Sequence, residues 1–141
     1  MNAPQDPGFR QRIEGSFGRQ KAMALIGARL AVVEAGRVEI ALPFRDELTQ
    51  QKGFVHGGII GMIADSACGY AALSSMPAGS DVLSVEFKLN LLRPAAGERF
   101  VARAQVLKRG KTLTAVRADV FATMGVQERL IAAMQATMIR R

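Results

Sequence analysis

Apolar and polar positions follow two different periods along this chain, and the change between them predicts its elements. Residues 59–73 are apolar or small on nearly every face, at a length that suits a helix better than a strand. Elsewhere apolar residues alternate with polar ones, as in half-buried strands, over 38–44 before this segment and over 84–91, 99–106, 114–120 and 130–138 after it. The pattern therefore predicts one buried helix enclosed by an antiparallel sheet.

The N-terminal part has a different pattern. Phe9, Ile13 and Phe17 lie four residues apart and predict one amphipathic helix from Pro7 to about Lys21, after a loose tail at 1–7. A strand at about 24–33 is expected to form a hairpin with the next one. The sequence thus predicts a single α+β domain over 8–141, with a sheet of about six strands wrapped around one long helix, plus a short N-terminal helix. Such a sheet has open edges, which favours self-association.

Charge and composition narrow the possible partners. The 141 residues carry 19 Lys and Arg against 12 Asp and Glu, a net charge of +7, which favours nucleic acid, an anionic lipid surface or a phosphate-rich small molecule. Nucleic acid ranks last, because the chain has no Trp, one Tyr and no recognition motif. One Cys and one His make a disulfide framework or a metal site unexpected. Without a long apolar run or a signal-peptide pattern, we expect a cytoplasmic protein with no membrane partner.

Candidate chemistry gathers on the buried helix. Asp65 is the only charged residue between Lys52 and Asp81, and a buried carboxylate needs partners, a proton or an open cleft beside it. His56 and Gly57 come where the first amides of the helix have no partner within it, a place that attracts an anion or a polarised carbonyl oxygen. Structural explanations stay open here, since Asp65 could pair with an arginine and His56 could be a hydrogen-bonded structural residue.

These residues belong to a longer motif, Gln50-x5-His56-Gly57-Gly58-x6-Asp65, followed by Ser84-Val85-Glu86 and Asn90-x2-Arg93-Pro94-x2-Gly97. From about Ile26 to the C-terminus, the chain resembles the hotdog-fold acyl-CoA thioesterases of the PaaI-like, phenylacetate-catabolism family. The resemblance implies hydrolysis of acyl-CoA thioesters with a medium-chain or aromatic acyl group. It also implies that no cofactor is needed, coenzyme A being part of the substrate, and that the protein forms a homodimer with shared active sites and further a homotetramer.

The resemblance assigns roles position by position. Asp65 matches the catalytic acid, as general base or nucleophile, and Gly57 matches the residue whose N–H polarises the thioester carbonyl. His56 would brace the loop or assist at the carbonyl. Ser84 would help to position water, although on its strand it is expected to face the polar side. Gln50 stands where many members have Asn, so that a side-chain amide remains beside the carbonyl.

Further substrate contacts are expected from apolar and basic residues. The apolar ones line an acyl tunnel or pack in the core, and the basic ones lie near strand ends and turns, where they reach phosphates or are solvated. The set comprises Gly58, Phe54, Tyr70, Met76, Arg93, Arg109 and Lys111.

The spacing of the two main candidates limits how they act. In a helix, Gly57 and Asp65 are about 12 Å apart, at roughly 1.5 Å per residue, too far to serve one carbonyl. If both act, the site is shared between two subunits. The alternative is a non-catalytic acyl-CoA sensor or scaffold on the same fold.

Overall fold

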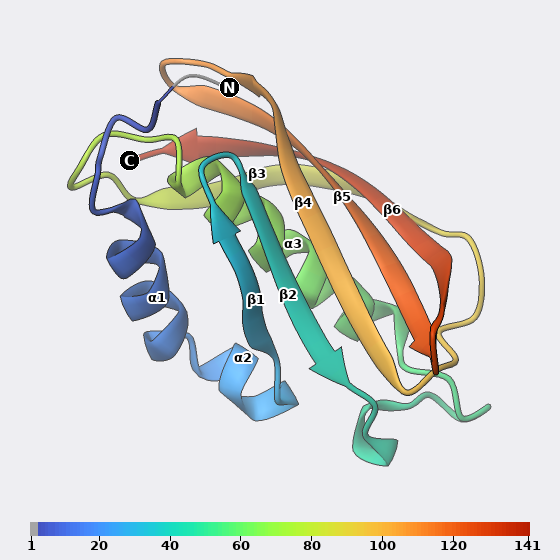
Figure 1. Cartoon of the computed structure of the whole chain (residues 1–141). Coiled ribbons are helices and arrows are strands. Elements are labelled where there is room, and N and C mark those ends of the chain that lie inside the picture. The colour runs from blue at the N-terminus through green and yellow to red at the C-terminus, as the bar shows by residue number, and fades with distance from the viewer. Residues whose placement is uncertain (1–2) are drawn as a thin grey trace.

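Six strands form one antiparallel sheet that curves around the long helix α3 (Gly57–Leu73), in a computed structural model that describes residues 3–141 (Figure 1). Their spatial order is β1-β2-β4-β5-β6-β3. The strands are β1 (Arg29–Glu34), β2 (Arg37–Pro43), β3 (Val82–Leu91), β4 (Arg99–Arg109), β5 (Leu113–Met124) and β6 (Gln127–Arg140). The predicted α+β hotdog fold is therefore confirmed.

The alternation seen in the sequence becomes the two faces of this sheet. Side chains at every second position point toward α3 and are buried, as Ile40 of β2, Phe100 of β4 and Val116 of β5 show. Burial of these apolar surfaces against the helix is the main stabilising term of the domain. β3 lies at one end of the sheet, where one of its edges has no partner strand among the described residues.

Glycines at regular spacing let β3 pack closely against α3. Gly57, Gly61 and Asp65 follow one another at intervals of four, so they share one side of the helix. A Cβ atom would lie only 2.6 Å from Leu91 Cδ1 if added at Gly57, and 3.3 Å from Leu89 Cδ2 if added at Gly61. The same side therefore brings Asp65 to β3. Ten of the 17 residues of α3 are buried, while Asp65, Ser66 and Gly69 are half-buried.

The N-terminal region differs from the prediction. Instead of one helix to Lys21 and a strand from residue 24, the chain forms α1 (Phe9–Arg19) and α2 (Lys21–Ile26), separated by Gln20 in an extended conformation. Gly27 has a φ of 80° and ends α2 in the left-handed conformation, a common helix termination. The predicted strand therefore begins only at Arg29, and its first residues belong to α2, where Met23 and Ile26 pack into the core.

Arg12 holds α1 against the end of α3. Its guanidinium donates to the carbonyl oxygens of Leu73 and Met76, and to two more in the following loop, at 3.1–3.3 Å. Its Nε lies 3.1 Å from Asp6 Oδ2. Of the predicted tail at 1–7, residues 1 and 2 lie outside the described residues, whereas Gln5 Nε2 donates to Ser75 O at 3.2 Å. This fixes α1 beside α3, where it borders the site described next.

Candidate active site

Asp65 is accessible and hydrogen-bonded rather than enclosed by apolar side chains. It lies near the middle of α3, and Ser84 Oγ donates to its Oδ1 at 2.5 Å. Ser84 is exposed and comes from β3, across from Met138 of β6, whose sulfur lies 3.3 Å from the same hydroxyl. One carboxylate oxygen is thus held in place while the group stays in contact with solvent.

Ser84 faces the helix, so the expectation that it points to the polar side of its strand is wrong. A bulge between Ser84 and Glu86 shifts the pairing with β6, and Val85 is the extra residue. As a result Ser84 lies opposite Met138, which is buried against α3, on the same side of the sheet as Leu89. Strict alternation along β3, which does not allow for the extra residue Val85, places Ser84 on the opposite, polar side of the strand.

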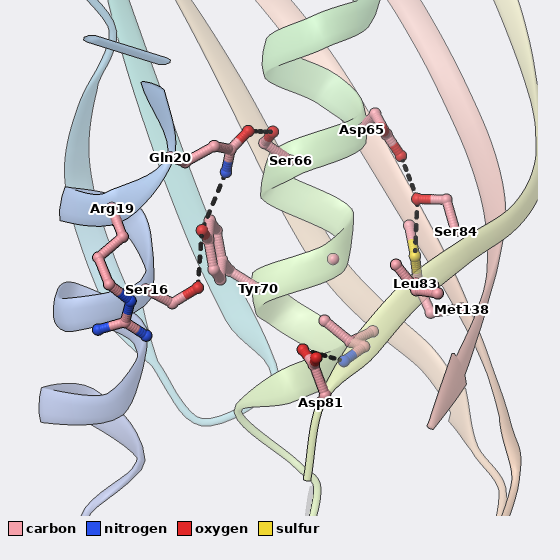
Figure 2. Close-up of a pocket in the computed structure, with 12 residues that line it drawn as sticks. Ser16, Arg19, Gln20, Asp65, Ser66, Tyr70, Asp81, Leu83, Ser84 and Met138 are labelled. Atoms are coloured by element: carbon pink, nitrogen blue, oxygen red, sulfur yellow. Dashed lines mark hydrogen bonds between the residues drawn. The ribbon is translucent and has the colours of Figure 1, made fainter. Parts of the chain in front are cut away.

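A cavity of about 530 Å³ opens beside Asp65, over the exposed strip of α3 and between α1 and β3 (Figure 2). Asp65 and Ser84 form one flank. On the other flank, Gln20 Nε2 donates to the Tyr70 hydroxyl at 2.9 Å, and Ser66 Oγ donates to Gln20 Oε1 at 3.1 Å. Ser16 Oγ lies 3.2 Å from the same Tyr70 hydroxyl. A side chain added at Gly69, between the flanks, would meet nothing within 4 Å, so the floor of this cavity is open.

The start of α3 offers one free amide. His56 is the N-cap, and its Nδ1 accepts the N–H of Gly58 at 2.8 Å, while its carbonyl oxygen accepts the N–H groups of Ile59 and Ile60. The N–H of Gly57 has no acceptor within residues 3–141. His56 therefore braces the first turn, and Gly57 is left as the donor that can polarise a ligand oxygen.

The Gly57 end of α3 borders a second cavity of about 380 Å³. Its walls are mainly apolar and include Phe54 and Leu91, with Gln50, Lys52 and Arg93 as polar members. The Gln50 Oε1 atom accepts the backbone N–H of Lys52, which leaves the Nε2 group as a donor. The side-chain amide of Gln50 and the backbone amide of Gly57 thus border the same cavity.

Within one chain the two halves of the predicted site stay apart. Asp65, Ser84 and Tyr70 border the first cavity, whereas Gln50, Gly57 and Phe54 border the second, and the two cavities have no lining residue in common.

The remaining candidates are distributed more widely. Arg93 borders the second cavity, while Met76 is 4% exposed and packs in the core, outside the lining of either cavity. Arg109 ends β4 and Lys111 lies in the turn after it, about 33 Å along the strand from the end nearest Arg93, at roughly 3.3 Å per residue. One chain does not bring these two basic residues close to Arg93.

Two other kinds of chemistry find no support in the described residues. Burial, followed by the negative charge of Asp65, raises the pKa of the Cys68 thiol to about 12, so this thiol remains protonated and is a poor nucleophile at neutral pH. Within residues 3–141, no three His, Cys, Asp or Glu side chains gather closely enough to hold a metal ion. No helix of that part of the chain is long and apolar enough to cross a membrane.

Sequence reasoning missed several residues around both cavities. Ser66 and Gly69 follow Asp65 by one and four residues on the same helix, so a helical projection could have placed them near it. Ser16 and Arg19 come from α1 and Gln20 directly follows it, about 50 positions earlier, and only the tertiary structure brings them there.

Comparison with known proteins identifies the family and supports the fold. The family model described as the thioesterase superfamily matches residues 52–128. A solved thioesterase family protein from Silicibacter pomeroyi is 50% identical, with a TM-score of 0.93 over 94% of this chain and 98% of that one. The PaaI protein of the E. coli phenylacetic acid degradation operon has a TM-score of 0.86 over 97% and 96% of the two chains; at 20% identity it supports the fold alone.

Curated relatives match over a shorter region. The human protein named acyl-coenzyme A thioesterase 13 is 33% identical over 85 residues, which is 60% of either chain. A protein named putative esterase from Saccharolobus solfataricus is 34% identical over 87 residues, 62% of this chain and 61% of its own. The match thus spans about three fifths of the length of these relatives. The family model covers more than half of the chain and includes both Gly57 and Asp65. The chain belongs to the thioesterase superfamily.

Proposed function

We propose that this protein hydrolyses acyl-CoA thioesters to a free acid and coenzyme A, with Asp65 as the general base or nucleophile. The observation that carries the proposal is the accessible Asp65 carboxylate, held by Ser84 beside an open cavity. A carboxylate that had only a structural role would be expected to have a cationic partner, and no arginine or lysine pairs with Asp65 within residues 3–141.

The reaction requires two groups at one carbonyl. As a base, Asp65 takes a proton from water while the water oxygen attacks the thioester carbon; as a nucleophile, its free oxygen attacks the carbon directly. Negative charge then develops on the carbonyl oxygen, where the Gly57 N–H and the Gln50 amide are suitable donors. The C–S bond breaks as the carbonyl reforms, and the coenzyme A thiolate takes up a proton. In the base route the product is the free acid. In the nucleophile route it is a mixed anhydride of the acyl group with Asp65, which a water molecule then cleaves to release the acid and restore the carboxylate.

A twofold dimer would bring these groups together. β3 is an edge strand, and it carries large apolar side chains that are half exposed: Val85 at 54%, Phe87 at 46% and Leu91 at 58%. Pairing of two β3 edges would continue the sheet and cover this apolar surface. Two α3 helices would then lie side by side, with the Gly57 end of one facing Asp65 of the other. A homotetramer would be a dimer of such dimers.

The acyl group is proposed to be medium-chain or aromatic. The cavity beside Asp65 has a volume of about 530 Å³ and an open floor at Gly69, and Tyr70 lines it, so it can accommodate one ring or a chain of moderate length. The names of relatives, acyl-coenzyme A thioesterase 13 in human and 1,4-dihydroxy-2-naphthoyl-CoA hydrolase in Listeria monocytogenes, support coenzyme A thioesters as the substrate class.

Thiol release from a panel of acyl-CoA esters tests the proposal. The native protein is expected to turn over at least one medium-chain or aromatic ester, and Asp65→Asn should lower kcat at least 10²-fold, roughly the contribution of a positioned acid or base. Asp119→Asn is the matched control, because this carboxylate lies on β5 and is paired with Arg117 at 3.0 Å. Tight binding of the esters without turnover by the native protein would instead support the sensor.

A further inference from the structure

The cavity beside Asp65 has a second set of polar side chains that takes no part in the hydrolysis described above. Figure 2 shows them joined by hydrogen bonds between the N-terminal helices and α3. They are Ser16 of α1, Gln20 directly after it, and Ser66 and Tyr70 of α3, and we call them the polar flank. Ser16 and Gln20 lie outside residues 52–128, which the family model matches. Membership of the superfamily therefore does not account for the polar flank.

The polar flank keeps hydrogen-bonding capacity that its own contacts do not use. Gln20 Nε2 gives one hydrogen to the Tyr70 hydroxyl, and its second hydrogen has no acceptor within residues 3–141. Gln20 Oε1 accepts from Ser66 Oγ, and an amide oxygen can accept one bond more. Of the paired hydroxyl groups of Ser16 and Tyr70, one donates to the other, and the acceptor keeps its own hydrogen. The polar flank can thus both donate to a ligand and accept from it.

The chemistry of the acyl group decides whether this capacity is satisfied. Ser16, Gln20 and Ser66 are half-buried, so they reach solvent while the cavity is open. An acyl group that fills the cavity displaces solvent from them, and a wholly apolar one leaves their donors unpaired, which costs about tenfold or more in kcat/KM. A hydroxyl group on the acyl chain donates and accepts at once, so it restores these hydrogen bonds.

The charges around this cavity suit the acyl end of the substrate better than the coenzyme end. Its charged side chains are Asp65, Asp81 and Arg19, which are two carboxylates against one guanidinium. Coenzyme A carries several negative charges, which this balance repels, whereas a hydroxylated acyl group is uncharged. From Asp65 to Tyr70 the helix rises roughly 7.5 Å, at about 1.5 Å per residue. The polar flank is therefore remote from the reacting carbonyl but within the same cavity.

We propose that the polar flank, and Gln20 in particular, selects acyl groups that carry a hydroxyl group at the end remote from the thioester carbonyl. The inference rests on the thioesterase function proposed above, and it narrows the medium-chain or aromatic acyl groups to their hydroxylated members. The Gln20 amide gives its second hydrogen to the hydroxyl oxygen, and a lone pair of the polar flank accepts the hydroxyl hydrogen. Gln20, at the break between α1 and α2, is thus a specificity-determining residue.

The test compares matched esters that differ only in this hydroxyl group. One pair is octanoyl-CoA and its ω-hydroxy derivative, and the other is phenylpropanoyl-CoA and its para-hydroxy derivative. In at least one pair, the native protein is expected to have a kcat/KM about tenfold or more higher for the hydroxylated ester. Gln20→Leu removes the amide at similar size and should bring this ratio to about one or below. Tyr70→Phe keeps the ring beside Phe17 and should lower the ratio by a smaller factor, since Gln20 loses the partner that orients it.

Gln11→Leu makes the same chemical change on α1, where Gln11 is exposed and borders neither cavity. It is expected to keep the native ratio. Because both esters are measured with one enzyme preparation, a purely structural effect of a substitution on the amount of active protein leaves the ratio unchanged.

Two results would overturn the selection while the hydrolase itself stands. One is a native ratio near or below one in both pairs of esters, and the other is a ratio that Gln20→Leu leaves at its native value. A fall of the ratio in Gln11→Leu equal to that in Gln20→Leu would also overturn it. Failure of the native protein to cleave any of the four esters would overturn the proposed function, and this selection with it.

Discussion

Replacing Gly57 by proline and by alanine separates the amide hydrogen from the shape of the glycine. Proline removes the N–H, and it is well tolerated at the first position of a helix, where Gly57 stands directly after its N-cap. The preceding residue, His56, already has φ −57° and ψ 136°, a conformation that a following proline favours. Gly57→Pro should therefore keep α3 intact.

The alanine variant controls for bulk. Any Cβ at position 57 would lie 2.6 Å from Leu91 Cδ1, so both variants push on the same flexible side chain. Gly57→Ala keeps the N–H, and Gly57→Ala combined with Leu91→Ala also relieves the crowding. What distinguishes Gly57→Pro from Gly57→Ala is chiefly the donor.

Loss of one donor at a developing oxyanion typically costs about 10²–10³ in kcat, or about 2.7–4 kcal/mol. We expect that difference between Gly57→Pro and Gly57→Ala in an assay of thiol release, with KM changed much less. Thermal melting and circular dichroism would verify that both variants remain folded. A Gly57→Pro protein that is folded and within about threefold of Gly57→Ala, a difference well under 1.4 kcal/mol, would refute the role of this amide.

Three further predictions concern other parts of the chain. Gly69→Ala should raise the free energy of unfolding by about 0.5–1 kcal/mol, because alanine favours the helix over glycine and a Cβ there meets nothing within 4 Å. Gly69→Leu should lower kcat/KM for aromatic and medium-chain esters while leaving kcat/KM for acetyl-CoA unchanged. Unchanged selectivity among these esters would exclude the cavity floor at Gly69 from the acyl site. Arg12→Met should cost about 2–4 kcal/mol in a denaturant titration, since four carbonyl oxygens lose a charged donor; a loss under about 0.5 kcal/mol would contradict that role. Because burial raises the pKa of Cys68 to about 12, iodoacetamide at pH 8 should label it only after unfolding, and rapid labelling of the native protein would show an open core.

Much of the fold could be predicted from the sequence, because the patterns that indicate its main elements lie within each element. The continuous apolar run of α3 and the alternation in β2, β4, β5 and β6 each reflect burial on known faces, and the structure keeps them. The end of α1 and the short helix α2 were not foreseen, because six residues of α2 carry little periodicity and their burial depends on packing against the core. Gly27, the residue that ends α2, was the available signal.

The site was only partly predictable. Asp65 and Gly57 could be identified because charge and glycine are unusual in an apolar helix, and the family motif assigned their roles. The side on which Ser84 lies could not be counted from alternation, since the bulge at Val85 reverses it. Ser16, Arg19 and Gln20 gave no local signal, since only the tertiary structure brings them to the cavity beside Asp65.

Mixing two inactive subunits tests the shared site most directly. In a mixed dimer, the Asp65→Asn subunit supplies an intact Gly57 and the Gly57→Pro subunit an intact Asp65, so one of the two twofold-related sites is complete. Heterodimers purified through two different tags are predicted to recover about half of the native activity per dimer. As a control, heterodimers of the native chain with the Gly57→Pro, Asp65→Asn double variant should stay inactive, because each site then carries one defect. Heterodimers of the single variants that are no more active than their parents would contradict the account.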